Sequence, residues 1–269
     1  MELQDGTDRA VFITAASANS IAIDEEGRIH AWGPGADDVP QELTDGEVPV
    51  TTAEIVDYSD ASMAVDTEGR IHAWGTNAEQ VPAELTDGTI DVVDTAINTY
   101  GKSAMAVDSD GHVHAWGQAA PTVPDELADG TVHVTDLVAA GNWFVALDDT
   151  GTVHNIGQPR TNVPTPTQLT DGSTEVVSIS AGYNNFLALD DRGKVYYWGD
   201  RSPGNDMSSS LQDGYINVTA IAAGRTFGLA VGSHIESTPD PGPGSEPEPG
   251  AGGNNGPAGS LNPAGSLGS

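Results

Sequence analysis

Four histidines recur at one position of a repeated motif, and they are the first candidates for metal binding. They are His30, His72, His114 and His154, and Tyr196 occupies the fifth equivalent position. A single metal ion needs its protein ligands at about 2 Å. Equivalent positions in separate structural units lie too far apart for that, and tyrosine replaces histidine once. We therefore predict a structural role for these side chains and no metal site.

Calcium binding and catalysis are the other chemistries to consider. The sequence DSDG at 108–111 resembles the start of a calcium loop, but the third acidic ligand and the distal glutamate are missing. The chain has no G-x-S-x-G motif, no phosphate-binding loop and no carboxylate pair that stands out from the repeats. We predict no cofactor and no enzymatic activity. A propeller lyase or hydrolase, the alternative, would require a deep central pocket with several convergent carboxylates.

The motif that carries the histidines recurs along the chain. GRIHAWG occurs at 27–33 and at 69–75, and GHVHAWG, GTVHNIG and GKVYYWG follow at 111–117, 151–157 and 193–199. The closing glycines are spaced by 42, 42, 40 and 42 residues. A period of this length is typical of one blade of a β-propeller.

Each repeat has the pattern of short strands joined by turns. In residues 46–87, TAEIVDYS, SMAVDT and RIHAWG are strand-like, and VPAEL carries a proline that suits a fourth strand at the sheet edge. An Asp-x-x-Gly motif between the middle strands predicts a tight hairpin turn. No stretch has a capped apolar period of 3.6 residues, so we predict an all-β chain with almost no helix.

The two ends of the repeat region complement each other. The N-terminal MELQDG (1–6) is the end of a repeat without its body, and residues 216–231 are a body without its end. Six copies of the middle strand are present. We predict a closed β-propeller of six blades with about 42 residues each, in which blade six is shared between the N- and C-termini. Closure removes the exposed sheet edges. A seven-bladed ring would need a blade for which the sequence shows no repeat.

The segments 139–157 and 181–199, AAGNWFVALDDTGTVHNIG and AGYNNFLALDDRGKVYYWG, resemble the regulator of chromosome condensation (RCC1-like) repeat. The resemblance covers about residues 10–235, and five of the six units carry the core of the pattern. It implies a propeller used mostly as a binding platform, since the family includes a nucleotide exchange factor and a secreted β-lactamase inhibitor. The units are shorter than the family's typical blade and lack its usual histidine. The chain also lacks the wedge and basic segments of the exchange factor.

The charge of the chain excludes some partners. Aspartate and glutamate total 40 against 9 lysines and arginines, which gives a net charge of −31. This charge opposes binding to nucleic acid and anionic lipid, and it suits a surface that stays hydrated in molar salt. We interpret the chain as a halophilic, haloarchaeal protein. It has no cysteine, no membrane-spanning run and no signal peptide, which predicts a cytoplasmic protein, a processed form or a component of a virion.

The composition changes near residue 236, which divides the chain into a propeller (1–235) and a Pro/Gly/Ser-rich tail (236–269). Such a tail is typical of a disordered linker. The repeated PAGSL, however, brings Leu261 and Leu267 into an otherwise apolar-poor segment. We therefore expect these leucines to dock the tail into a neighbouring subunit.

The loops in which the repeats differ are the candidate binding surface. The loops after the first strand of each repeat should gather on one rim, and aromatic residues with arginine and asparagine are typical interface anchors. Their simpler role would be to cover the blade ends. The loops after the WG motif contain rare positive charges that suit an acidic partner. The candidates are Tyr58, Tyr100, Trp143, Tyr183, Asn184 and Arg225 on the first rim, and Arg160 and Arg201 on the second.

These observations predict a non-enzymatic interaction module that binds protein or glycan through its rim loops. Salt adaptation and a docking tail favour a surface component of a haloarchaeal virus particle, such as a spike, turret or tail fibre. Its partners would be other protein subunits, copies of itself and a host surface protein or glycan, with no nucleic acid and no membrane insertion. The alternative is a cell-surface or cytoplasmic scaffold of a halophile with the same fold.

Overall fold

The structure is a computed structural model that describes residues 9–234, apart from 17, 57–60, 77, 99, 158–163, 200–210, 212–215 and 226. The chain divides into a repeat unit, Met1–Ile235, and a C-terminal unit, Glu236–Ser269, which lies outside the described residues. None of the described helices has the length and apolar character needed to span a membrane.

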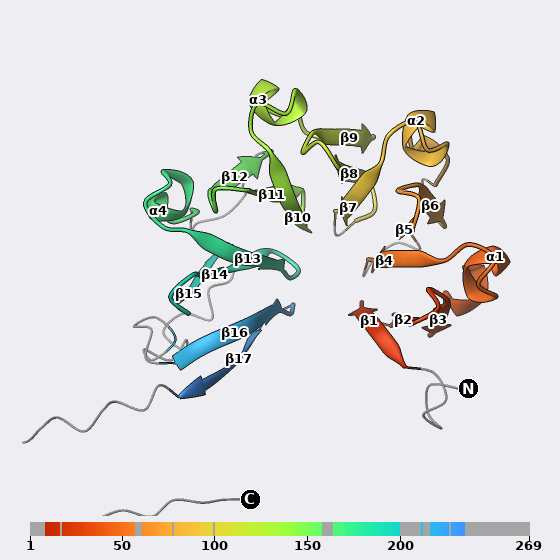
Figure 1. Cartoon of the computed structure of the whole chain (residues 1–269), viewed down its shortest axis with the longest axis horizontal. Coiled ribbons are helices and arrows are strands. Elements are labelled where there is room, and N and C mark those ends of the chain that lie inside the picture. The colour runs from red at the N-terminus through yellow and green to blue at the C-terminus, as the bar shows by residue number, and fades with distance from the viewer. Residues whose placement is uncertain are drawn as a thin grey trace, which may run out of the picture. The chain divides into compact units, whose positions relative to one another are not determined.

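The repeat unit is built from six antiparallel sheets in chain order, which we call the first to the sixth sheet (Figure 1). Each of the first five has an inner, a middle and an outer strand, and the described part of the sixth has two. The strands are β1 (Ala10–Ala15), β2 (Ser20–Asp24), β3 (Ile29–Trp32), β4 (Val50–Ile55), β5 (Ser62–Asp66), β6 (Ile71–Trp74), β7 (Val92–Ile97), β8 (Ser103–Asp108), β9 (Val113–Gly117), β10 (Val134–Ala140), β11 (Trp143–Asp148), β12 (Val153–Ile156), β13 (Val176–Ala181), β14 (Asn185–Asp190), β15 (Val195–Gly199), β16 (Ile216–Ala223) and β17 (Gly228–His234).

The Asp-x-x-Gly motifs form the hairpin turns that the sequence predicts. In the first repeat, the N–H of Gly27 donates to the carbonyl of Asp24 at 3.0 Å, and β2 pairs with β3 on either side of the turn. Gly27 has φ +79°, and the glycines at the four equivalent turns also have positive φ. A side chain is strained in this backbone conformation, so the regular spacing of these glycines follows from the turn itself.

The prediction of a fourth, edge strand at VPAEL and its equivalents is wrong. These segments form single helical turns: α1 (Gln41–Thr44), α2 (Ala83–Thr86), α3 (Asp125–Ala128) and α4 (Thr167–Thr170), and short 3-10 turns η2 (Ala36–Asp38) and η3 (Ala78–Gln80) precede the first two. A proline with φ near −55° stands before each helical turn, where a missing N–H costs nothing. One leucine of each turn points inward and is fully buried, as Leu43 is in α1.

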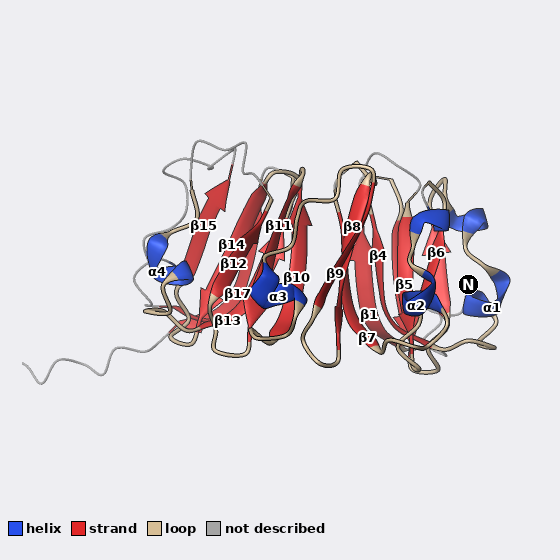
Figure 2. Ribbon diagram, turned by 90° about the horizontal axis from the view of Figure 1, so that it is seen from above, coloured by secondary structure: helices blue, strands red, loops and turns tan. Residues whose placement is uncertain are grey.

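Consecutive sheets stack face to face, and the inner strands converge on a common centre (Figures 1 and 2). An apolar cluster fills each of the five interfaces between neighbouring sheets. Between the fourth and fifth sheets, for example, Trp143 packs against Phe186, with ring centroids 4.8 Å apart, and Phe186 stacks on Trp198. The core is therefore divided among the interfaces, as in a propeller.

The predicted sharing of blade six lies partly outside the described residues. Residues 10–15 pair with the first sheet as β1, while 1–8 and everything after 234 are not described. The sixth sheet therefore consists of β16 and β17 alone within the described part of the chain. Closure of the ring stays a prediction.

Candidate functional site

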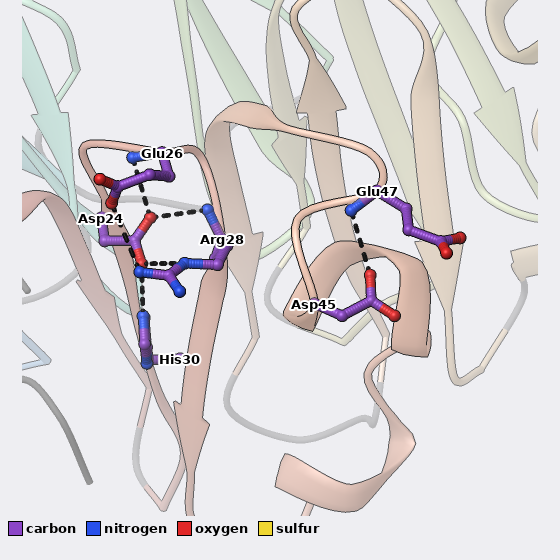
Figure 3. A network of polar contacts seen from close by, with 6 residues as sticks. All are labelled: Asp24, Glu26, Arg28, His30, Asp45 and Glu47. Atoms are coloured by element: carbon purple, nitrogen blue, oxygen red, sulfur yellow. Dashed lines mark hydrogen bonds and ion pairs between the residues drawn. The ribbon is translucent and has the colours of Figure 1, made fainter.

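The repeated histidines serve the hairpin turns. In the first repeat, Asp24 Oδ1 accepts the backbone N–H groups of Glu26 at 3.1 Å and of Arg28 at 2.9 Å (Figure 3). Its Oδ2 accepts from Arg28 Nε and from His30 Nε2, both at 2.7 Å. One buried carboxylate therefore holds both the turn and the outer strand.

The same arrangement recurs at the other turn aspartates, Asp66, Asp108, Asp148 and Asp190. His72, His114 and His154 bond to the first three at 2.7–2.8 Å, and the Tyr196 hydroxyl donates to Asp190 at 3.1 Å. No cluster of three metal-ligating side chains exists among the residues the structure describes. Tyrosine can replace histidine at this position because the position requires only a hydrogen-bond donor to the carboxylate.

The pKa values of the turn aspartates follow from these contacts. Burial alone would raise the pKa of Asp24, but the hydrogen bonds from His30 and Arg28 outweigh burial and hold the pKa below its usual value. The pKa of Asp66 is lowered in the same way by His72 and Arg70. These carboxylates are therefore ionised and structural at neutral pH.

A second set of polar side chains connects the inner strands of neighbouring sheets. Glu54 accepts the N–H of Ile97 at 2.8 Å, and Asp94 accepts the N–H of Leu137 at 2.9 Å. Ser180 Oγ accepts the N–H of Ala223 at 2.9 Å. In each case the partner lies 43 positions further along, in the next sheet.

Three carboxylates of the inner strands, Glu54, Asp94 and Asp136, lie close enough to affect one another. Burial, followed by the negative charge of Asp136, raises the pKa of Asp94 to about 8. Burial and the charge of Asp94 raise the pKa of Glu54 well above its ordinary value, and burial raises the pKa of Asp136. Convergent carboxylates are what a catalytic propeller would need, but Glu54 and Asp94 each bind a backbone N–H of the neighbouring sheet. We therefore assign them to the connection between sheets.

At the end of the inner strands is a cavity of ≈ 360 Å³, which we call the channel mouth. All six sheets contribute to its lining, through residues at or just after the end of each inner strand. They include Ala15, Glu54, Ile97, Ala139, Tyr183 and Arg225, one from each sheet in order. The described loops after the first strands therefore lie on one rim, as the sequence predicts, while the loop at 57–60 lies outside the described residues.

Aromatic and cationic side chains meet at the channel mouth. The Tyr100 and Tyr183 hydroxyls are 3.2 Å apart, and their rings meet edge to face with centroids 6.4 Å apart. The guanidinium of Arg225 lies over the Tyr183 ring, 5.0 Å from its centroid. Tyr100 is 40 % exposed, and Arg225 and Phe227 are also exposed. Three of the predicted rim residues thus form one surface.

The loop that carries Tyr100 is fixed by a buried asparagine. Asn98 Oδ1 accepts the N–H of Lys102 at 2.8 Å, and its Nδ2 donates to Asn142 Oδ1, in the loop of the next sheet, at 3.0 Å. Gly101 has φ +63°, which lets the chain turn between the two strands. The tyrosine is therefore held out at the rim by its own loop.

The other predicted site residues do not contribute to this surface as described. Trp143 is only 3 % exposed and belongs to the core between the fourth and fifth sheets, so it is not available to a partner. It is the first residue of β11, where its ring packs on Phe186. Asn184 is partly buried and lies against Gly141. Five candidates lie outside the described residues: Tyr58, Arg160, Arg201, Leu261 and Leu267.

Phe227 and the three inner-strand carboxylates Glu54, Asp94 and Asp136 were not identified from the sequence. Phe227 lies two residues after Arg225 in the same variable loop, so the loop itself was the available signal. Asp94 and Asp136 occupy equivalent positions, one repeat apart, in strands that are otherwise apolar or hydroxylated. An acidic residue that recurs at an inner-strand position was the signal for these.

Comparisons with known proteins agree with this geometry. The model of the regulator of chromosome condensation (RCC1) repeat matches residues 176–202, which span β13 to β15. The structure of Prp20p from Saccharomyces cerevisiae has a TM-score of 0.61 at 15 % identity, and the match covers 88 % of this chain and 71 % of that one. The fold is that of a β-propeller, and the repeat at 176–202 matches the RCC1 pattern. No curated protein matches the sequence.

Two further solved structures resemble this chain in fold. Human WBSCR16 has a TM-score of 0.61 at 16 % identity, over 85 % of this chain and 73 % of that one. The CRINKLY WD40 ectodomain of the Arabidopsis thaliana receptor kinase ACR4 has a TM-score of 0.64 at 15 % identity, over 84 % and 77 %. At these identities the likeness concerns the propeller fold.

Proposed function

We propose that this chain is a non-enzymatic interaction module that binds a protein or a glycan at the channel mouth. The observation that carries the proposal is the meeting of Tyr100, Tyr183 and Arg225, from three different sheets, beside a cavity that all six sheets line. Tyrosine and arginine are the residue types that most often dominate binding energy at interfaces. Tyrosine also presents a large apolar ring at low entropic cost.

The carboxylates of the inner strands support binding rather than catalysis. Glu54 and Asp94 each accept a backbone N–H of the neighbouring sheet, and moving them to serve a substrate would break the contact between sheets. Prp20p, the similar propeller from Saccharomyces cerevisiae, binds Gsp1p and histones. A protein partner is therefore consistent with how one similar propeller is used.

We propose the surface of a haloarchaeal virus particle as the setting, with a cell-surface or cytoplasmic scaffold of a halophile as the alternative. The support is the net charge of −31 and a tail rich in proline and glycine. In the proposed particle, copies of the chain and other subunits are the partners, and Leu261 and Leu267 dock the tail. Deleting residues 240–269 should prevent incorporation into the particle, and unchanged incorporation would contradict the docking role.

We also propose that the sheets close into a ring of six blades, with the last blade shared between the two ends of the repeat region. The support is the complementary content of residues 1–6 and 216–231, together with the stacking of five consecutive interfaces.

The binding proposal can be tested without knowing the partner. A displayed library of short random peptides and a glycan array would be screened against the full chain, and the binders would be measured against Tyr183→Ala and Arg225→Ala. Arg192→Ala is the matched control, because Arg192 is an exposed arginine of the same fifth sheet in the hairpin turn at the other end of its strands. We expect affinity to fall at least about tenfold in the two mouth variants, as for interface anchors, and to be unchanged in the control. Binders that respond only to Arg192→Ala would refute the proposal.

A further inference from the structure

The face of the first sheet that points away from the second sheet is exposed where the repeat predicts burial. Ile13 on β1 is 75 % exposed and Trp32 on β3 is 49 % exposed. The strand registers identify their equivalents in the later sheets, which face the preceding sheet. In the second to fifth sheets those equivalents are all 8 % exposed or less: Ala53, Thr95, Leu137 and Ile179 for Ile13, and Trp74, Trp116, Ile156 and Trp198 for Trp32. The equivalent of Ile13 in the sixth sheet, Ile221, is partly buried.

The face of the sixth sheet that points away from the fifth sheet is also exposed. Leu229 and Val231 on β17 are 59 % and 65 % exposed. Their equivalents in the fifth sheet, Leu187 and Leu189, are buried because the sixth sheet covers them. The first and sixth sheets thus each present one half of an apolar interface.

Exposure elsewhere on these strands provides an internal control. Val11 is also exposed, but it stands at the bulge of β1, and the valines at the same bulge of β7 and β13, Val93 and Val177, are exposed too. Val11 is thus exposed because this position is exposed in other repeats as well. Ile13, Trp32, Leu229 and Val231 are exposed because no neighbouring sheet covers the faces on which they lie.

Each of the first four interfaces between neighbouring sheets contains a leucine from a helical turn. Leu43 of α1 lies in one apolar cluster with Ile21 and Ile23 of the first sheet and Val50 and Ala53 of the second. Leu85, Leu127 and Leu169 occupy the same place at the next three interfaces and are 1 % exposed or less.

The sequence contains one further copy of this leucine. The segment ELQDG at 2–6 precedes β1 by the same distance at which ELTDG, 42–46, precedes β4. Leu3 is therefore the residue that corresponds to Leu43, and its interface is the one between the sixth and the first sheets.

We propose that the segment 2–6 of this chain occupies the apolar gap between the first and sixth sheets, with Leu3 covering Ile13, Trp32, Leu229 and Val231. This inference rests on the proposed closure of the ring. The polar connection used at other interfaces is impossible here, because Ala220 and Ala222 stand where Asp136 and Ser180 stand in the fourth and fifth sheets. The interface therefore depends on apolar contact, which Leu3 supplies.

The segment fits this place better than a second copy of the chain would. Residues 2–6 are attached a few positions before β1, so their effective concentration at the two faces is high. Head-to-tail pairing of the two faces between copies would extend without limit unless its rotation happened to close.

Single cysteine substitutions can test the proposed position of residues 2–6, because the chain has no cysteine of its own. Ile13→Cys, Leu229→Cys and the control Val11→Cys would be made in the full chain and labelled with a maleimide fluorophore. We expect labelling at 13 and 229 to be at least about tenfold slower than at 11, as for a site that must open before it reacts. Deletion of residues 2–6, or Leu3→Asp if the deletion prevents folding, should raise the rates at 13 and 229 to that of the control.

The labelling results distinguish the role of residues 2–6 from the closure of the ring itself. Fast labelling at all three positions in the intact chain would overturn both. Slow labelling at 13 and 229 that persists without residues 2–6 would show that the faces meet directly, and it would overturn the role of Leu3 alone. Protection that appears only as the mass measured by light scattering doubles would assign the faces to a second copy and overturn the proposal.

Discussion

The pKa of Asp94 leads to a prediction about how stability depends on pH. Asp94 lies on β7, its Oδ2 accepts the N–H of Leu137, and burial together with the charge of Asp136 raises its pKa to about 8. In the unfolded chain the ordinary value is 3.8. Between these two values the folded protein holds a proton at Asp94 that the unfolded chain has lost. The stabilisation is thus full at pH values below 3.8 and is lost as the pH rises through about 8.

The size of the effect follows from one bound proton. The proton bound at Asp94 should make the free energy of unfolding fall by about 1.4 kcal/mol for each unit that the pH rises. Between pH 5 and 7 this amounts to roughly 3 kcal/mol. Asp94→Asn should remove this contribution, because the amide is neutral at every pH and its oxygen can still accept the N–H of Leu137. Glu54 and Asp136, whose pKa values are also raised, should leave a residual slope of the same sign.

Urea unfolding followed by tryptophan fluorescence at pH 5, 6 and 7 would measure the slope. Asp125→Asn is the control, because it makes the same substitution at an exposed carboxylate on α3. Both variants remove one carboxylate from the unfolded chain, so the unfolded states remain matched in charge. If the slopes of Asp94→Asn and Asp125→Asn are the same, the assignment of a bound proton to Asp94 is refuted.

Two further predictions concern the core and the turns. Trp143→Ala should cost about 3–5 kcal/mol of stability, as for other buried aromatics, because Trp143 is buried against Phe186. The melting temperature should therefore fall. Tyr100→Ala, at an exposed rim position, is the comparison, and equal melting temperatures for the two variants would be inconsistent with the core assignment. Asp66→Asn should cost about 1.5–3 kcal/mol at pH 7 through weakened hydrogen bonds from Arg70 and His72. Because the pKa of Asp66 is lowered, the stabilisation that it adds is present above 3.8 and is lost as the pH falls through its folded value. Chemical denaturation at pH 7 and at pH 3 would check this, and a difference that grows toward pH 3 would count against the reasoning.

The fold was predictable where one short segment determines its own conformation. The Asp-x-x-Gly turns were of this kind, since aspartate and glycine specify a tight turn locally and the structure has them at every predicted position. The helical turn at VPAEL was not. Its proline suits an edge strand as well as a helix start, and the choice depends on whether the leucine finds a cavity between two sheets.

The candidate site was predictable in its place and only partly in its members. The repeat period brought the loops with Tyr100, Tyr183 and Arg225 to one rim, because equivalent positions end at the same side of stacked sheets. Trp143 belongs to the same stretch of sequence, but its side chain points into the core. Side-chain direction at a strand end depends on register, and the composition of a loop does not reveal it.

The central claim is that the channel mouth is the binding surface. Amide hydrogen exchange of the full chain, with and without a binder selected from the peptide or glycan libraries, tests it most directly. We expect the binder to slow exchange in the loops at 98–102, 182–185 and 224–227. Slower exchange confined to the hairpin turns at 24–27, 66–69 and 190–193, with none at the mouth, would contradict it.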